Sequence, residues 1–231
     1  IRKYRSLIPF LIREKIRDVI LIGGANSNHV LGLTQLLIEN GIRPILFLRG
    51  SFSEYSQNIY GNLFFLKFFI NLENVHWIAR KNWSEVIQIA SQMYSKAFIL
   101  AEGGMHPNAL PGLITLALDI NRNEEMLNLS FKHIFVDAGT GFTAISLLLA
   151  FAFHKKESLI HPLLLADEKE IFLNKLHVWH QEFEKMIGAA CPFPYRFCLH
   201  QPKNAKSFGS TNKKLFEEIK DIAKTEGFLT A

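Results

Sequence analysis

Short apolar runs alternate with amphipathic stretches along the whole chain. The apolar runs are rich in Ile, Val, Leu and Phe and have the length of strands. They predict seven strands, at 19–22, 45–48, 75–78, 97–100, 134–136, 159–165 and 195–199. The amphipathic stretches predict eight helices, at 4–14, 28–40, 57–71, 83–94, 112–121, 143–154, 168–187 and 212–225. Continuous apolar strands that alternate with helices are typical of parallel sheets covered on both faces, so the sequence predicts an α/β protein.

The order of these elements predicts two layered units. The Gly/Pro-rich segment AEGGMHPNALPG, at 101–112, divides a smaller α/β domain at 1–111 from part of a larger one at 112–231. Each is expected to be a three-layer α/β/α domain with a mostly parallel sheet. Asn82 to Glu85 has the spacing of a capping box, and Gly41 and Gly227 stand where helix C-caps are expected.

Composition narrows the class of protein. The chain has 231 residues, of which 48% are hydrophobic, so it can bury a large core. The net charge of +5 is scattered, which predicts no nucleic-acid partner. The longest apolar run, at 144–153, is shorter than the roughly 20 residues of a membrane span, so it predicts a buried helix and no membrane partner.

The two cysteines, Cys191 and Cys198, predict a reducing, cytoplasmic location rather than a disulfide framework. Their spacing matches no metal motif, so no metal is predicted.

The first glycine-rich junction is Gly23-Gly24-Ala25-Asn26-Ser27-Asn28-His29, which follows the strand at 19–22. The two glycines permit backbone geometry that other residues avoid, and Ser27 or Asn28 can cap the next helix. The amides at a helix N-terminus favour a carboxylate or a phosphate. The alternative is an ordinary turn between a strand and a helix.

The second junction, Gly139-Thr140-Gly141-Phe142-Thr143, also joins a strand to an apolar helix. Its glycines, hydroxyls and amides can surround a phosphate. The junction lacks the lysine of a Walker loop and the full GxGxxG fingerprint. A monophosphate is therefore a better match than a dinucleotide or a triphosphate.

Other polar positions have structural interpretations that compete with chemistry. Glu102 is expected to be a turn or domain-contact residue rather than a catalytic carboxylate. Gly61 lies inside a helical pattern, where glycine costs about 1 kcal/mol against alanine, so it needs a packing or capping reason. His177 and His180 are interpreted as a solvated helix face rather than metal ligands. Ser27 lies outside any nucleophile-elbow sequence, which argues against a serine hydrolase.

Several motifs occur together in a characteristic order. They are IRKYRSLIPFL, IGGANSNHVLGLTQLL, LRG, YGNLFFL, AEGGMHPNALPG, DAGTGFTAISL and KSFGS followed by KTEGFLT. In this order they resemble the 1-aminocyclopropane-1-carboxylate deaminase / D-cysteine desulfhydrase family. These are pyridoxal-phosphate enzymes with the tryptophan-synthase-β-like fold, fold type II. The resemblance covers nearly the whole chain.

The resemblance implies roles for both junctions. Ser27, Asn28 and His29 match the family's helix start that holds the substrate carboxylate, and Ser27 is the candidate catalytic residue. Asn28 would also lie beside the cofactor's 3-hydroxyl. The cofactor phosphate would be held by a cup of five residues, Gly139, Thr140, Gly141, Phe142 and Thr143. The resemblance also implies a homodimer.

The chain differs from the family pattern at the position of the Schiff-base lysine. The family pattern runs Gly-Asn-Lys-x-Arg-Lys, and Ile1-Arg2-Lys3 matches only its tail. Lys3 then corresponds to the second lysine, near the cofactor phosphate, and the Schiff-base lysine is expected just before Ile1. Omitted flanking residues are the favoured explanation; a fragment or a degenerate homologue are the alternatives. Leu31 replaces an Arg often found in the family, so the substrate can differ.

The expected activity is that of a lyase or deaminase that converts a small amino acid into ammonia and a 2-oxo acid. The deaminase branch tends to carry Gln where His29 stands, which favours desulfhydrase-like chemistry with release of sulfide. The alternative is a non-catalytic homologue that binds pyridoxal phosphate or another phosphate ligand. Either function requires the junctions at 27–29 and 139–143 to face one cleft.

Overall fold

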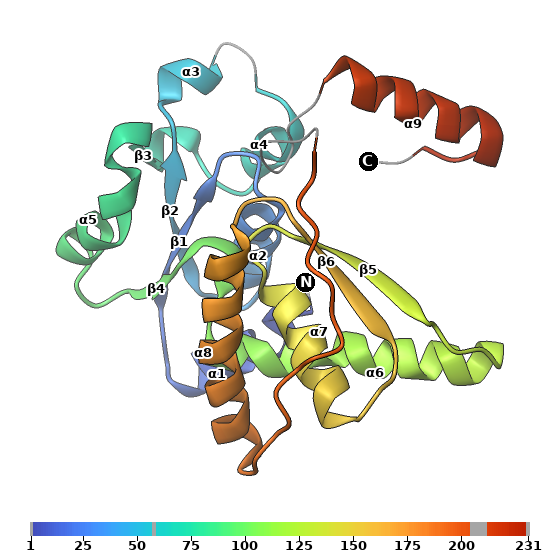
Figure 1. Cartoon of the computed structure of the whole chain (residues 1–231). Coiled ribbons are helices and arrows are strands. Elements are labelled where there is room, and N and C mark those ends of the chain that lie inside the picture. Colours follow the sequence, from blue (N-terminus) through green and yellow to red (C-terminus); the bar gives the residue numbers. More distant parts are fainter. Residues whose placement is uncertain (1, 57–58, 204–211, 230–231) are drawn as a thin grey trace. The chain divides into compact units, whose positions relative to one another are not determined.

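The computed structural model describes residues 2–56, 59–203 and 212–229 (Figure 1). The chain forms two compact units, Ile1–Asp119 and Ile120–Ala231, called unit 1 and unit 2 below. The division falls inside one long helix, α6 (Leu110–Leu127). The functional domain boundary between 111 and 112 stays a prediction.

Unit 1 is built on a four-stranded parallel sheet in the order β3-β2-β1-β4. The strands are β1 (Asp18–Gly24), β2 (Arg43–Arg49), β3 (His76–Ile78) and β4 (Phe98–Leu100). All four predicted strands are confirmed, and the parallel pairing confirms the predicted class. The central strands are buried because they are apolar at nearly every position, as expected where helices cover both faces.

Two helical layers cover this sheet. On one face, Ile20, Ile22 and Phe47 pack with Val86 and Ala90 of α5 (Val86–Met93). Successive side chains of a strand point to opposite faces, so the residues between them face the other layer. That layer contains α2 (Asn28–Glu39), which contacts β1 and β2, and α1 (Tyr4–Arg13), which contacts α2. The predicted three-layer arrangement is therefore confirmed for unit 1.

The loops of unit 1 contain shorter elements. These are α3 (Phe52–Ser56), α4 (Gly61–Leu66) and the 3-10 turns η1 (Leu72–Asn74), η2 (Arg80–Glu85), η3 (Glu102–Gly104) and η4 (Pro107–Ala109). The helix predicted at 57–71 is wrong in extent, because Tyr60 is extended, Gly61 has φ +60°, and the helix ends at Leu66; positions 57 and 58 lie outside the described residues. The capping box at 82–85 is also wrong. Those residues lie within η2, and α5 begins after them without a side-chain cap.

Unit 2 contains the parallel pair β5 (His133–Ala138) and β6 (Leu159–Leu164). Its helices are α7 (Phe142–Phe153), α8 (Lys169–Ile187) and α9 (Lys213–Glu226), as predicted within about two residues at each end. Gly41 and Gly227 follow their helices in left-handed conformation, which confirms both C-cap predictions.

The strand predicted at 195–199 forms only isolated bridges to β6, Ile160 to Phe197 and Leu163 to His200. The amides of Ile160 and Leu164 donate to the carbonyls of Arg196 and His200, at 3.1 and 2.8 Å. A regular ladder would place one more donor between them, at position 162. Pro162 has no N–H and interrupts the ladder, which explains why this segment is not a regular strand.

Candidate functional site

The site in unit 1 lies at the carboxyl end of β1. From β1 the chain continues through α2 to β2 on one side, whereas β4 pairs on the other side of β1. The loops that follow β1 and β4 therefore leave neighbouring strands at a topological switch point, the usual place for a ligand in an open parallel sheet. Both predicted glycine-rich segments of unit 1, at 23–29 and 101–112, follow these two strands.

Ser27 is the N-cap of α2. Its backbone is extended, with φ −70° and ψ 125°, and its Oγ accepts a hydrogen bond from the Val30 amide at 3.4 Å. The turn is tight, because a Cβ atom at Gly23 would lie 2.7 Å from Cγ2 of Val30. Of the two predicted caps, Ser27 is the one used, and its hydroxyl proton remains able to donate.

Asn28 is oriented by Asn62 at the start of α4. Nδ2 of Asn62 donates to the Asn26 carbonyl at 3.0 Å and to Oδ1 of Asn28 at 2.6 Å. A carbonyl only accepts, so it fixes which end of the Asn62 amide is the donor, and Asn28 must present its oxygen there. The exposed Asn28 therefore keeps its NH₂ group available as a donor to a ligand.

Glycine at position 61 allows the start of α4 to pack closely against Asn26. Its φ is +60°, and a Cβ atom there would lie 2.9 Å from Oδ1 of Asn26. The same Oδ1 accepts the Leu63 amide at 3.1 Å. We predicted from the sequence that Gly61 has a packing or capping reason, and its contact with Asn26 is that reason.

His29 is buried, with 7% of its surface exposed. Its Nδ1 lies 2.6 Å from the hydroxyl of Tyr4, which also lies 3.2 Å from the His29 carbonyl. Its Nε2 is buried and has no hydrogen-bond partner among the described residues. A buried polar atom without a partner costs about 1–3 kcal/mol, so this nitrogen marks a place where a ligand atom would be stabilising.

Gly104 and Lys3 lie next to His29. Gly104 has φ +65°, and a Cβ atom there would lie 2.8 Å from Cε1 of His29 and 3.6 Å from Cε of Lys3. Nζ of Lys3 donates to the carbonyl of Gly103 at 2.5 Å. No carboxylate is paired with Lys3 among the described residues, so its ammonium lies against neutral groups.

Burial controls the protonation of all three side chains. It lowers the pKa of Lys3 to about 8. Burial, together with the charge of Lys3, lowers the pKa of His29 to about 3, so its imidazole is neutral at pH 7. Burial raises the pKa of Tyr4, whose hydroxyl stays protonated. The corner formed by these side chains thus offers one cation and several neutral polar groups, which favours an anionic ligand.

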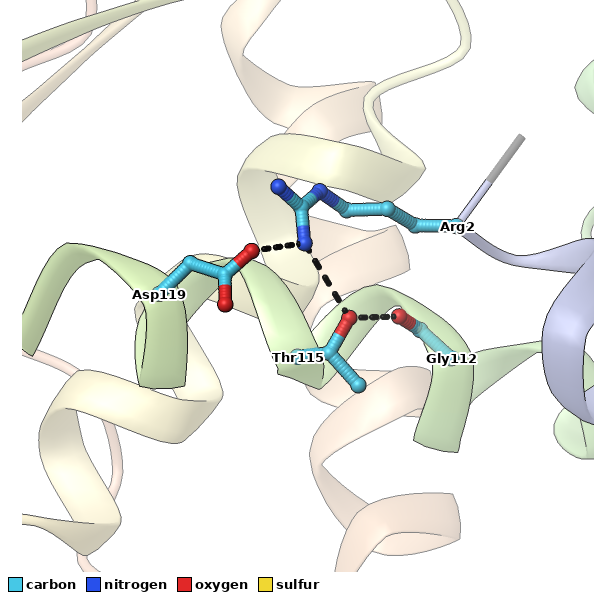
Figure 2. Close-up of polar contacts among 4 residues, drawn as sticks. All are labelled: Arg2, Gly112, Thr115 and Asp119. Carbon is cyan, nitrogen blue, oxygen red and sulfur yellow. Dashed lines mark hydrogen bonds and ion pairs between the residues drawn. The ribbon is translucent and has the colours of Figure 1, made fainter. Parts of the chain in front are cut away.

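The segment that carries Lys3 is anchored on α6 (Figure 2). Nη1 of Arg2 pairs with Asp119 and lies 3.4 Å from Oγ1 of Thr115, which in turn donates to the Gly112 carbonyl at 2.7 Å. A Cβ atom at Gly112 would lie 2.3 Å from the Arg2 carbonyl oxygen, so only glycine permits this approach. These contacts fix the backbone on which Lys3 is held.

The second predicted junction lies in unit 2, between β5 and α7. Gly141 is the N-cap of α7 with φ +82°, and a Cβ atom there would lie 3.1 Å from two ring carbons of Phe172. The side chain of Phe142 is buried, so its contribution to a ligand site would be its amide. The first amides of a helix have no partner within it, so Phe142 and Thr143 present N–H groups to an anion.

Lys175 of α8 borders this loop. Its Nζ lies 3.4 Å from the Thr140 carbonyl and 2.6 Å from Oδ2 of Asp167. The Asp167 carboxylate is 16% exposed, so the pair is largely shielded from water. Sequence patterns gave no sign of this contact, because residues 140, 167 and 175 meet only through the fold of unit 2.

The remaining candidates have structural partners. Glu102 accepts a hydrogen bond from the Trp83 indole at 3.3 Å. His177 stacks on Phe193 with centroids 4.4 Å apart. His180 has a side chain only 13% exposed, and its Nε2 lies 2.9 Å from the Cys191 carbonyl oxygen. The prediction of a solvated face is thus wrong for His180, which bonds to the backbone.

Sequence relatives of this chain carry names from the predicted family. It is 26% identical over 231 residues to a rice protein (Oryza sativa subsp. japonica), named provisionally as D-cysteine desulfhydrase 2, mitochondrial, covering 81% of this chain and 54% of that protein. It is 22% identical to a 1-aminocyclopropane-1-carboxylate deaminase of Mesorhizobium japonicum, covering 66% and 48% of the two chains. The chain thus spans about half the length of the curated relatives it matches. No family profile matches it.

Solved structures identify the fold. A crystal structure of an ACC deaminase homologue matches with TM-score 0.79 and 20% identity over 99% of this chain and 68% of that one. A pyridoxal 5'-phosphate-dependent aspartate racemase matches with TM-score 0.60 and 9% identity over 98% and 67% of the two chains. The fold is that of the fold type II enzymes, and the resemblance found in the sequence is confirmed.

Proposed function

We propose that this chain is part of a pyridoxal-phosphate-dependent lyase or deaminase that converts a small amino acid into ammonia and a 2-oxo acid. The observation that carries the proposal is the corner at the start of α2. There His29, whose buried Nε2 has no hydrogen-bond partner among the described residues, and the partly buried Lys3 both border Gly104. Such a corner favours a carboxylate or phosphate, and the amino-acid and cofactor anions have these groups.

The substrate carboxylate would be bound by Ser27, Asn28 and His29. A carboxylate only accepts hydrogen bonds, so it would select the His29 tautomer with its proton on Nε2. In that tautomer Nδ1 accepts from Tyr4, which lies 2.6 Å away. Ser27 has a hydroxyl proton to donate, and Asn28 has the NH₂ group that Asn62 leaves available. Each residue therefore supplies a donor, which is what a carboxylate requires.

The cofactor phosphate would be bound by the loop Gly139 to Thr143. Support comes from the positive φ of Gly141 and from the amides at the start of α7. Phe172 lies next to Gly141, so a side chain at 141 would crowd its ring. Lys3 would be near the phosphate, as the family resemblance implies, and the expectation that this loop and the start of α2 face one cleft stays a prediction.

Pyridoxal phosphate, when bound, supplies an electron sink for the electrons released at the substrate's α carbon or its neighbour. The residues of this chain would bind and orient the amino acid. His29 is neutral at pH 7 and buried, so it serves as a fixed hydrogen-bond donor rather than a base. Ser27 is exposed enough to reach the substrate, and it is the candidate catalytic group.

D-Cysteine and 1-aminocyclopropane-1-carboxylate are the two substrates to test first, because they are in the names of the relatives. His29 in place of the glutamine of the deaminase branch favours D-cysteine and release of sulfide. The predicted homodimer and the cytoplasmic location stay predictions. In the part of the chain that the structure describes, no helix has both the length and the apolar character to cross a bilayer.

Binding is best measured with pyridoxamine 5'-phosphate, which lacks the aldehyde and therefore does not react with surface lysines. Asn28→Ala is expected to weaken its binding roughly 10–100-fold, since one hydrogen bond to a charged or strongly polar ligand contributes about 1.5–3 kcal/mol. Asn40→Ala, at the opposite end of α2, is the matched control and should bind like the wild type. Equal affinity in the wild type and Asn28→Ala would contradict the assignment.

Turnover separates the enzyme from the non-catalytic alternative. The whole protein of which this chain is proposed to be part is expected to release ammonia and a 2-oxo acid from one of the two amino acids. Cofactor binding without turnover of either substrate would support the alternative, a binding protein. Absence of any cofactor binding would overturn both.

A further inference from the structure

A second cluster of polar side chains lies in unit 2, on one face of the β5–β6 sheet. It contains four side chains with nitrogen or sulfur donor atoms, His133, His161, Cys198 and His200. None of them belongs to the proposed cofactor loop.

Backbone geometry places these residues on the same face. His133 and Phe135 are two residues apart on β5, so their side chains point to the same face of the sheet. Phe135 lies opposite His161 of β6 in the parallel register. Cys198 and His200 are likewise two residues apart on the extended segment beside β6. Their amides donate to the carbonyls of Ile160 and Pro162, both at 2.9 Å. These backbone hydrogen bonds fix the positions of the two residues beside β6.

The imidazoles form a chain of short contacts. Nδ1 of His161 lies 2.8 Å from Nε2 of His200, and Nε2 of His161 lies 3.0 Å from Nδ1 of His133. One donor atom from each of His161, Cys198 and His200 lies within 4.8 Å of the others. His161 is buried, at 8% exposed, His200 is partly buried, and Cys198 is open to solvent.

We propose that His161, Cys198 and His200 form a binding site for a zinc ion, with water as the fourth ligand. Two imidazole nitrogens and one thiolate are the ligand types that zinc prefers, and three protein ligands plus water form an open tetrahedral site. A site of this composition also binds cobalt(II), which provides a spectroscopic probe.

Only small movements are needed to admit the ion. Zinc–nitrogen and zinc–sulfur bonds of about 2.0 and 2.3 Å place tetrahedral ligands about 3.3 to 3.5 Å apart. The two nitrogens, now 2.8 Å apart, would separate slightly, and the sulfur, within 4.8 Å, would approach. Cys198 is exposed, so its side chain can rotate without disturbing the core.

His133 is positioned to orient the buried ligand. If Nδ1 of His161 binds the metal, its proton lies on Nε2, from which it donates to Nδ1 of His133. Metal-bound histidines usually donate their second nitrogen in this way, and the partner fixes the ring orientation. His133 is therefore a positioning residue in this site, and Phe135, stacked on His161 with centroids 4.4 Å apart, holds the ring from its face.

Zinc binding to the untagged protein, kept reduced, tests the site by competition with a chromophoric chelator. We expect one zinc per chain in the wild type. His200→Ala and Cys198→Ser each remove a ligand and should weaken binding by more than the roughly 10–100-fold typical of an outer-shell change. His154→Ala, an exposed histidine outside the cluster, is the matched control and should bind as the wild type does.

Cobalt(II) tests the thiolate directly. The cobalt-loaded wild type should show a thiolate-to-cobalt charge-transfer band that is absent from Cys198→Ser. His133→Ala should keep the band and weaken the affinity about 10-fold. Circular dichroism verifies that each variant is folded. A wild type that binds less than one zinc per chain, or equal affinity in the wild type, His200→Ala and Cys198→Ser, would overturn the proposal.

Discussion

The buried His29 makes the stability of unit 1 depend on pH in a way that can be calculated. Burial and the charge of Lys3 lower the pKa of His29 to about 3 in the native protein. The pKa of histidine in an unfolded chain is about 6.5. Below pH 6.5 the unfolded chain therefore takes up a proton at His29 that the native protein does not. The stabilisation from the neutral imidazole is complete above pH 6.5 and is lost as the pH falls toward 3.

The size of the loss follows from these two values. Between pH 7 and pH 5, linkage predicts that His29 alone lowers the free energy of unfolding by about 2 kcal/mol. His29→Gln removes the titrating group. The other groups titrate in both proteins, and Tyr4 stays protonated in both because burial raises its pKa. The difference in unfolding free energy between wild type and His29→Gln should therefore shrink by about 2 kcal/mol over this range.

Urea unfolding followed by tryptophan fluorescence measures this difference. Of the three tryptophans, Trp77 and Trp83 lie in unit 1 and Trp179 lies in unit 2. Measurements in a Trp179→Phe background make the signal report on unit 1. If the difference between wild type and His29→Gln is the same at pH 7 and pH 5, His29 is not a buried neutral imidazole and the proposed role at the start of α2 fails with it.

Three further substitutions test packing, two in unit 1 and one in unit 2. Gly104→Ala should lower the free energy of unfolding by about 2–3 kcal/mol, because φ is +65° and the new Cβ would lie 2.8 Å from His29. Gly41→Ala, with φ +67° and nothing within 4 Å, should lose only about 1 kcal/mol, and equal losses in urea would refute the close approach. In unit 2, Glu124→Gln should cost about 1–3 kcal/mol, because the buried carboxylate accepts a hydrogen bond from the partly exposed Lys156 at 2.7 Å. A thermal midpoint equal to that of the wild type would contradict this.

The sequence predicts the strands of unit 1 because their apolar character is local information. Ile20, Ile22 and Phe47 are apolar members of runs too short for helices, and they form the sheet core as expected. The predicted cap at Ser27 is confirmed for the same reason, since a cap bonds a residue three positions away. Where local signals mislead, as at 82–85, the chain forms a 3-10 turn instead of a capped helix.

The partners of the site residues could not be predicted, because they come from distant parts of the chain. Asn62 lies 34 positions from Asn28, and Tyr4 lies 25 positions from His29. Nothing in the sequence around an asparagine or a tyrosine indicates which distant residue its side chain will contact. The prediction of a regular strand at 195–199 is wrong for a similar reason. The residue that interrupts its ladder of hydrogen bonds, Pro162, lies in another segment.

The contact between His29 and Gly104 has a consequence for how this protein can change over evolution or in a design library. A side chain at 104 would meet the His29 ring, and the φ of +65° would strain a residue other than glycine there even if position 29 were smaller. Shrinking position 29 therefore removes only the steric part of the cost at 104. A screen that randomises both codons together should recover mainly glycine at 104, whatever residue stands at 29.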